Sequence, residues 1–196
     1  MKFVFIEGAT PIDEDEKQAL IPEHLQMQHE LNEFENLNIA QAMPWAHQQK
    51  NLLKVGFLKK LHKRMFGQTW QWAGQFRKSQ KNIGIEAYRI AAELYQLCGD
   101  IEYQIQNRSF DLDEIAIRFH HRLVFIHAFV NGNGRHARLA CDLLIQHLGN
   151  TSFSWGSKTY NHCDLSSLND MRRAYISALK GADRGDYVQL ISFSRA

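Results

Sequence analysis

A short glycine-rich stretch separates two segments of helical periodicity in the second half of the chain, and it reads His-Ala-Phe-Val-Asn-Gly-Asn-Gly-Arg-His-Ala-Arg at 127–138. Before it, apolar side chains recur at helical spacing, and Asp111 and Glu114 are spaced like an N-cap residue and its capping-box partner. After it, a second apolar stripe runs to Gly149, which is placed to end that helix. The pattern predicts a helix, a tight turn and a second helix that begins near Gly134.

The predicted turn has the features of an anion-binding site. The first N–H groups of a helix have no partner within the helix, and the helix dipole adds partial positive charge there. Gly132 and Gly134 allow a ligand to approach the backbone closely, and Asn133 adds an amide donor. Arg135 and Arg138 place two cations in the first turn, where a bound anion would offset them. We therefore expect these five residues to hold phosphate groups.

His127 immediately precedes this turn. Its imidazole titrates near neutral pH, so it can act as a general base on a hydroxyl group. A lone histidine is more often a buried residue with satisfied hydrogen bonds, and a lone Gly-x-Gly is usually only a turn. Here a base, a glycine-rich turn and two guanidinium groups occur in one short stretch, and this combination favours a functional site.

Composition adds general limits. A chain of 196 residues, 44% of them hydrophobic, can bury one core, so we expect one domain over residues 1–196, with an N-terminal helical extension of about residues 1–50 and a core of about 51–196. A net charge of +2 gives no indication of nucleic-acid binding. The three cysteines form no disulfide or metal pattern, and no apolar run is long enough to span a bilayer, so we expect a cytoplasmic protein without membrane contact.

The other segments predict an all-α protein with one short β-hairpin. Helical apolar periodicity predicts further helices over residues 28–47, 55–66, 94–105, 164–181 and 183–193, with Asp164 as an N-cap. Aromatic and β-branched residues surround a polar, glycine-containing centre between residues 70 and 90, which predicts a hairpin. The centre of that hairpin is Asn82, Ile83, Gly84 and Ile85.

The stretch at 127–138 resembles the signature of Fic (filamentation induced by cAMP) domain proteins, His-Pro-Phe-x-(Asp/Glu)-Gly-Asn-Gly-Arg-x-x-Arg. The His, the Phe, Gly-Asn-Gly-Arg and the last Arg match, whereas Ala128 replaces the Pro and Asn131 replaces the acidic residue. The two ends of the chain are similar to the Fic subgroup called mobile mystery protein B. Further segments that look like Fic sequences are residues 30–35, 61–66, 72–74 and 118–123.

This resemblance implies a Fic-type helical bundle whose hairpin is a flap, residues 82–85, that aligns a target protein by strand addition. It implies transfer of AMP from ATP to a Ser, Thr or Tyr hydroxyl of a protein substrate, with His127 as the base. The signature amides, Arg135 and Arg138 would hold the phosphates. Mg²⁺ would accompany ATP, held weakly by the neutral oxygen of Asn131.

Three other functions stay open. A phosphotransferase of the death-on-curing type would bind the nucleotide reversed, but that branch alters the Gly-Asn-Gly-Arg segment, which is intact here. A non-catalytic nucleotide-binding regulator is disfavoured because His127 is retained. A metal-dependent hydrolase would have to use His120, His121, His127 and His136, whose spacing fits no metal motif.

Many Fic proteins are silenced by a helix with Ser/Thr-x-x-x-Glu-Gly/Asn, whose Glu pairs with the second signature arginine, here Arg138. Thr10 and Glu14 have the spacing but lack the final Gly or Asn. Glu35 is followed by the required Asn, but Leu31 stands in place of the hydroxyl residue. Glu35 is the better inhibitory candidate of the two. Because neither match is complete, we expect no tight self-inhibition and a separate antitoxin protein as inhibitor.

Overall fold

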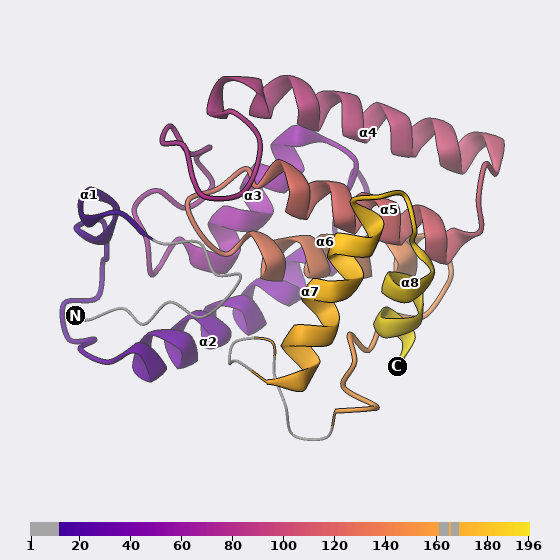
Figure 1. Cartoon of the computed structure of the whole chain (residues 1–196). Coiled ribbons are helices and arrows are strands. Elements are labelled where there is room, and N and C mark those ends of the chain that lie inside the picture. The colour runs from indigo at the N-terminus through magenta and orange to yellow at the C-terminus, as the bar shows by residue number, and fades with distance from the viewer. Residues whose placement is uncertain (1–11, 161–164, 166–168) are drawn as a thin grey trace.

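The computed structural model describes residues 12–160, 165 and 169–196. In this part of the chain the regular secondary structure is helical, apart from one isolated β-bridge between Leu20 and Trp70 (Figure 1). The α-helices are α1 (Glu14–Lys17), α2 (Gln28–His47), α3 (Val55–Phe66), α4 (Ile90–Asn107), α5 (Leu112–Ile126), α6 (Asn133–His147), α7 (Asp170–Ala182) and α8 (Val188–Arg195), and a 3₁₀ turn, η1 (Ala87–Arg89), precedes α4.

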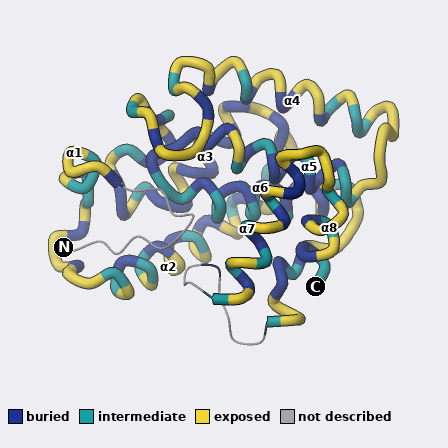
Figure 2. The backbone as a smooth tube through the Cα atoms, in the orientation of Figure 1, coloured by how far each residue is buried: buried dark blue, intermediate teal, exposed yellow. Residues whose placement is uncertain are grey.

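The helices α5 and α6 lie side by side at the centre of the molecule (Figure 1). The α4 helix runs along α5, α3 packs against α6 and α2, and α7 and α8 pack together in front of the central pair. Figure 2 shows that the central helices are mostly buried, whereas α4 alternates between buried and exposed residues along its length. The loop between α5 and α6 therefore lies between helices on several sides.

Two groups of apolar side chains stabilise this arrangement. The larger group fills the space between α2, α3, α4, α5 and α6, and its fully buried aromatic members are Phe66, Trp70, Phe119 and Phe129. The smaller group joins the opposite faces of α5 and α6 to α7 and α8; it includes Ile117, Cys141, Ile145, Tyr175 and Phe193. Fully burying side chains of this size contributes roughly 1.5–3 kcal/mol each, so the central pair is stabilised from both sides.

Most helix predictions are confirmed. The observed α2 and α3 have the predicted limits, with Pro44 inside α2 and not at its end. The α4 helix begins four residues before the predicted start, and α8 is shorter than predicted. Asn169 is the N-cap residue of α7, and its side chain accepts a hydrogen bond from the N–H of Arg172 at 2.9 Å. The cap predicted at Asp164 lies outside the described residues.

The predicted capping box of α5 is wrong. Asp111 is the N-cap residue, but its side chain makes no capping hydrogen bond. The carboxylate of Glu114 instead pairs with Arg118 at 2.8 Å, one turn later on the same helix. Gly149 follows the last residues of α6 with a φ of 91°, as predicted for a helix-ending glycine.

The predicted β-hairpin is also wrong, because residues 71–86 form turns and irregular backbone with no strand pairing. The backbone groups of this segment bond elsewhere. The N–H of Arg77 donates to the carbonyl of Ala128 at 3.0 Å, and the Arg77 guanidinium donates to the carbonyls of Ser79 and Ile85. The side chain of Lys81 is held by Asp13 and Glu16 near α1. These contacts replace the ladder that a hairpin would need.

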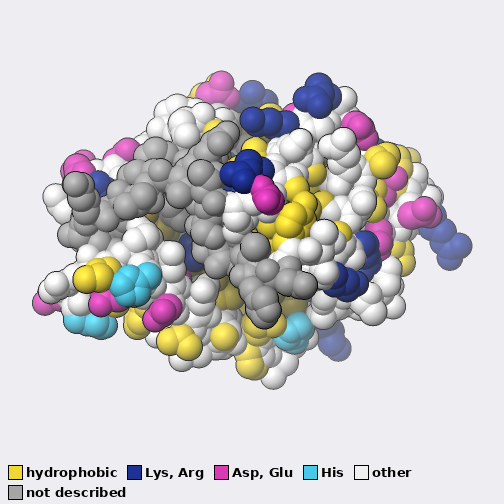
Figure 3. All heavy atoms as spheres, turned by 60° about the horizontal axis from the view of Figure 1, so that its bottom comes forward, with side chains coloured by type: hydrophobic (Ala, Val, Ile, Leu, Met, Phe, Trp, Pro, Cys, Tyr) yellow, Lys and Arg dark blue, Asp and Glu magenta, His cyan; other side chains and the backbone are white. Residues whose placement is uncertain are grey.

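Figure 3 shows one face of the molecule. On the part of this face that the structure describes, basic and acidic side chains are interspersed, as expected from the small net charge of the sequence. No helix in the described part of the chain combines the length and the apolar character that crossing a membrane requires.

Candidate active site

The stretch at 127–138 forms the loop and the helix start that the sequence predicts. The α5 helix ends at Ile126, and His127 follows in the left-handed conformation with φ 54° and ψ 57°. Gly132, with φ 77°, is the N-cap residue of α6. Non-glycine residues adopt positive φ uncommonly and at an energetic cost, so the surrounding contacts must hold His127 in place.

Gly132 cannot be replaced without disturbing this loop. A Cβ atom at Gly132 would lie 2.6 Å from the ring of Phe66 on α3. The space around Gly134 is open by comparison, since the nearest atom to a Cβ there is an Arg138 guanidinium nitrogen at 3.7 Å. The N-terminus of α6 is thus accessible beside Gly134, and Arg138 lies over it. The first N–H groups of the helix, which are the donors of the predicted anion site, lie at this end of α6.

Asn133 has a different role from the one expected. Its Nδ2 donates to the carbonyl of Phe129 at 2.8 Å, and its Oδ1 accepts from the N–H of Phe129 at 2.9 Å. The side chain is buried, so it closes the loop on itself. Its backbone N–H, in the first turn of α6, is the group that can face an anion.

Two buried histidines support the loop from beneath. The N–H of Gly74 donates to Nδ1 of His62 at 3.0 Å, so Nε2 of His62 bears the proton and donates to the carbonyl of Asn131 at 3.0 Å. The His62 ring stacks on Phe129 with the centroids 3.8 Å apart. His136 bonds through Nε2 to the carbonyl of Leu58 on α3 at 3.0 Å. Burial lowers the pKa of both imidazoles, that of His136 to about 4, so both are neutral.

His127 lies at the end of α5 beneath residues 77–85. It is buried, and burial together with the charges of Arg77 and Lys81 lowers its pKa to about 4, while a hydrogen bond to the Val124 backbone acts in the opposite direction. A neutral imidazole at physiological pH is the form that accepts a proton. The structure therefore gives His127 the ionisation state that a general base needs.

The two signature arginines differ in their surroundings. Arg135 forms an ion pair of 2.7 Å with Glu35 of α2, and its guanidinium lies over the Phe66 ring. The Arg138 guanidinium lies over the ring of Tyr175 of α7, 5.7 Å from the ring centroid, and it has no carboxylate within 4.0 Å among the described residues. One of the two expected phosphate-binding arginines thus pairs with a protein carboxylate, and the other lacks such a pair.

Asn131 is the residue for which the sequence predicts a weak metal role. Its Oδ1, a neutral carbonyl oxygen, accepts the N–H of Gly132 at 2.6 Å. Mg²⁺ is typically bound by one or two protein oxygens plus substrate phosphates and waters. The donor is compatible with Mg²⁺, but it brings no charge.

The histidines considered for a metal-dependent hydrolase point apart. His120 bonds to Tyr175 at 2.9 Å, and His121 bonds to Asp183 at 2.9 Å. Among the described residues, no group of three or more His, Cys, Asp or Glu side chains is arranged to hold a metal ion. This geometry disfavours the hydrolase.

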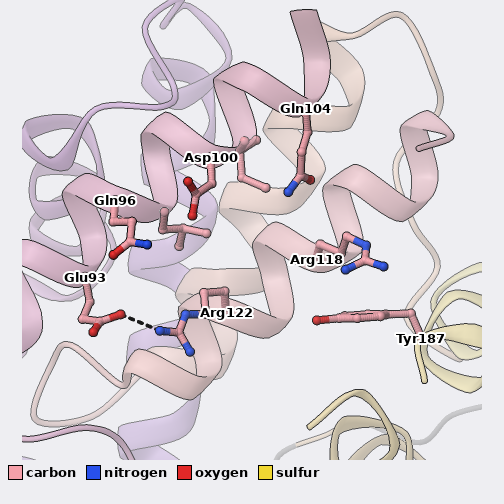
Figure 4. A pocket seen from close by; sticks show the side chains of 9 residues that line it. Glu93, Gln96, Asp100, Gln104, Arg118, Arg122 and Tyr187 are labelled. Carbon is pink, nitrogen blue, oxygen red and sulfur yellow. Dashed lines mark hydrogen bonds and ion pairs between the residues drawn. The ribbon is translucent and has the colours of Figure 1, made fainter. Parts of the chain in front are cut away.

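A pocket of about 160 Å³ between α4, α5 and Tyr187 contains none of the signature residues (Figure 4). Its charges are largely neutralised within the protein: Arg122 pairs with Glu93 at 2.5 Å, as the dashed line in Figure 4 marks, and Arg118 pairs with Glu114 at 2.8 Å. It has no uncompensated cation for a nucleotide phosphate, so the candidate active site is the loop between α5 and α6.

Comparison with known proteins found a family model that matches the segment containing this loop. A sequence model described as the Fic/DOC family matches residues 52–145, which include α3, α4, α5, the signature loop and most of α6. This part of the chain is similar to Fic/DOC family proteins. The matched residues include His127 and the loop that follows it, whereas Glu35 and Tyr175 lie outside them.

Several solved structures share the helical fold of this chain. Fic-1 of C. elegans is 20% identical with a TM-score of 0.68; the alignment covers 91% of this chain and 51% of the solved Fic-1 chain, so this chain spans about half of that solved chain. BepC of Bartonella tribocorum, solved with bound AMPPNP, is 18% identical with a TM-score of 0.66, covering 93% of this chain and 97% of BepC. A Fic domain from Bartonella quintana with bound ADP is 17% identical with a TM-score of 0.60, covering 88% and 86%.

Proposed function

We propose that this chain belongs to the Fic/DOC family and is a protein adenylyltransferase that moves AMP from ATP to a Ser, Thr or Tyr hydroxyl of a target protein. The observation that supports this most directly is the pairing of a neutral, buried His127 at the end of α5 with an open α6 N-terminus beneath Arg138. A base and an anion site at opposite ends of one loop are what transfer of a phosphorus group to a hydroxyl requires.

In the proposed reaction His127 accepts the proton of the target hydroxyl, and the hydroxyl oxygen forms a bond to the α-phosphorus of ATP. The bond from the α-phosphorus to the oxygen that bridges it to the β-phosphorus breaks, and pyrophosphate leaves. The N–H groups in the first turn of α6 stabilise the charge on the α-phosphate. Arg138, and Arg135 once it leaves Glu35, hold the outer phosphates and the pyrophosphate.

Magnesium fits this scheme as the companion of ATP, since it neutralises phosphate charge when bound. Asn131 would hold it through Oδ1. The bound AMPPNP of BepC and the bound ADP of the Bartonella quintana domain support a nucleotide as the ligand here too.

We also propose that residues 82–85 dock the target protein, although they form no strand in this structure. Pairing of a target strand with this segment would align a hydroxyl over His127 without reading the target sequence in detail. The proposed Fic domain includes the whole chain, residues 1–196, because α7 contributes Tyr175 beside Arg138. Membership of the mobile mystery protein B subgroup and inhibition by a separate antitoxin protein belong to the same proposal.

The deciding experiment is incubation of the protein with Mg²⁺ and ATP labelled on either the α- or the γ-phosphate, with a cell lysate as the source of targets. Label transferred to protein from the α-position alone supports adenylyl transfer. Label transferred from the γ-position alone identifies a phosphotransferase and refutes the proposal. Absence of transfer from both positions, with ATP binding retained in calorimetry, identifies a non-catalytic nucleotide-binding protein.

A further inference from the structure

Arg77 is almost completely buried, with 2% of its surface exposed. It is the first residue of a segment, residues 77–85, that includes the proposed docking residues 82–85 and is called the flap segment from here on. The Arg77 side chain joins this segment to the loop that bears His127. Its Nε donates to the carbonyl of His127 at 2.6 Å, and one terminal nitrogen donates to the carbonyl of Ser79 at 3.0 Å. The other terminal nitrogen donates to the carbonyl of Ile85 and, at 3.5 Å, to that of Ile126. One side chain thus joins both ends of the flap segment to the end of α5.

No ion pair compensates the Arg77 charge among the described residues. The carbonyls of Ile126, the last residue of α5, and of its C-cap His127 are among those without helical partners, and this end of the helix dipole is negative. A guanidinium group placed there satisfies these carbonyls and is stabilised by them. Burying a charged group is otherwise costly, so the arrangement depends on several carbonyl contacts made at once.

Gly84 brings the flap segment directly onto the base. Its φ is 94°, and a Cβ atom at this position would lie 2.5 Å from the Cβ of His127 and 2.9 Å from a guanidinium nitrogen of Arg77. The far side of the segment is anchored independently, because Lys81 pairs with Asp13 at 2.8 Å and with Glu16 at 2.5 Å. The flap segment is therefore held from both sides with His127 directly beneath Gly84.

We propose that Arg77 is a positioning residue of the transferase: its buried guanidinium fastens residues 82–85 to His127, so that a target docked on this segment presents its hydroxyl to the base. This rests on the proposed function for its role in transfer. The fastening itself is a property of the structure and can be measured without activity. A lysine keeps the charge but has no planar fork that reaches several carbonyls at once, so it replaces Arg77 only in part.

The first test measures the fastening. Amide hydrogen exchange at residues 82–85 is compared in the unmodified protein, Arg77→Gln, Arg77→Lys and Arg122→Gln, and the His127 ring is titrated by NMR. Arg122 is the control because it pairs with Glu93 and makes no contact with the flap segment. We expect Arg77→Gln to speed exchange at residues 82–85 about tenfold, since each 1.4 kcal/mol of lost protection is tenfold. Exchange and titration that are the same in Arg77→Gln and the unmodified protein would refute the proposal.

The titration separates positioning from general stabilisation. Arg77 and Lys81 are the two charged groups that depress the pKa of His127, and both belong to the flap segment. Removing the Arg77 charge should move the His127 midpoint to higher pH by about one unit, because a like charge within a few ångströms has an effect of that size. Arg77→Lys should keep the midpoint near that of the unmodified protein while still speeding exchange.

The second test measures transfer with α-labelled ATP. We expect Arg77→Gln to lower kcat about tenfold with little change in the KM for ATP, and Arg77→Lys to restore part of kcat. A loss confined to the KM for ATP would overturn the positioning role. If the unmodified protein transfers no label at all, the proposed function fails, and the exchange and titration results still decide whether Arg77 fastens the segment.

A second substitution keeps the proposal testable if Arg77→Gln fails to fold. Gly84→Ala leaves Arg77 intact but forces the flap segment away from His127. We expect it to speed exchange at residues 82–85 and to lower kcat as Arg77→Gln does. Unchanged exchange and kcat in a folded Gly84→Ala protein would refute the close coupling of the segment to the base.

Discussion

The carboxylate of Glu35, on α2, lies 2.7 Å from the guanidinium of Arg135, the first signature arginine. The same carboxylate accepts the indole N–H of Trp70 at 2.7 Å, and it is almost fully buried. The inhibitory pattern known for the family pairs its Glu with the second arginine, here Arg138, which lacks a carboxylate partner among the described residues. In the proposed reaction Glu35 would therefore compete with ATP for Arg135 and leave Arg138 available.

Glu35→Gln should lower the KM for ATP about threefold, because competition for one partly exposed arginine is worth about 0.5–1 kcal/mol. Glutamine keeps an acceptor for Trp70 and removes the charge that holds Arg135. The measurement is self-labelling with α-labelled ATP over a range of ATP concentrations. Glu33→Gln, at an exposed position of the same helix, is the control. A rise of tenfold or more at saturating ATP would instead show a tight internal brake, contrary to our expectation.

His127→Ala should reduce transfer at least about a hundredfold, the lower range for loss of a general base, while ATP binding measured by calorimetry survives. His127→Asn should behave alike and tests the backbone separately, since Asn tolerates the left-handed conformation that His127 adopts. His47→Ala, at an exposed site, is the control. Transfer near the unmodified rate in both His127 variants would remove this residue from the mechanism.

The protein should lose stability between about pH 6.5 and about pH 4. Burial lowers the pKa of four histidines, to about 3 for His120, to about 4 for His127 and His136, and well below the ordinary value for His62. In this window the unfolded chain binds protons that the folded chain does not, so the free energy of unfolding falls as pH falls.

Each of these histidines contributes about 1.4 kcal/mol per pH unit within the window. Asp142 acts in the opposite direction, since burial raises its pKa to about 6, but it is one group against four. Urea unfolding at several pH values within the window measures the effect. Equal midpoints throughout would show that the histidines are not buried in their neutral form.

Asn131→Asp should lower the Mg²⁺ concentration that gives half-maximal transfer by about tenfold, because an added carboxylate raises cation affinity. The measurement is transfer from α-labelled ATP in a magnesium titration. Asn51→Asp adds the same charge at an exposed residue far along the chain from the loop and serves as the control. An unchanged or raised requirement would count against a metal role for this position.

Local pattern was sufficient for the helices and for the loop at 127–138. The apolar stripe of α3 and the limits of α2 are present in the sequence as periodicity, and the glycines that flank Asn133 mark the helix start. These features depend on neighbours a few residues apart, which is the range over which periodicity is informative.

Periodicity could not predict contacts between residues that are far apart in the sequence. The aromatic and β-branched residues near residues 70–90 favoured a hairpin, but Arg77 bonds to the carbonyl of His127, 50 residues away, and Lys81 bonds to Glu16. Periodicity also places Glu35 on the buried face of α2 without indicating which arginine it meets. The burial of Arg77 depends on these distant contacts, so the sequence carries no local signal against the hairpin.

The apolar group that joins α5 and α6 to α7 and α8 has a practical consequence for expression of shortened proteins. The family match ends at residue 145, yet a fragment of residues 52–145 would uncover Ile117, Cys141 and Ile145 on the central pair. Apolar surface that becomes exposed to solvent in this way promotes aggregation. The fragment would also lack Tyr175, the aromatic neighbour of Arg138. The smallest piece worth producing for biochemistry therefore has to extend through α8.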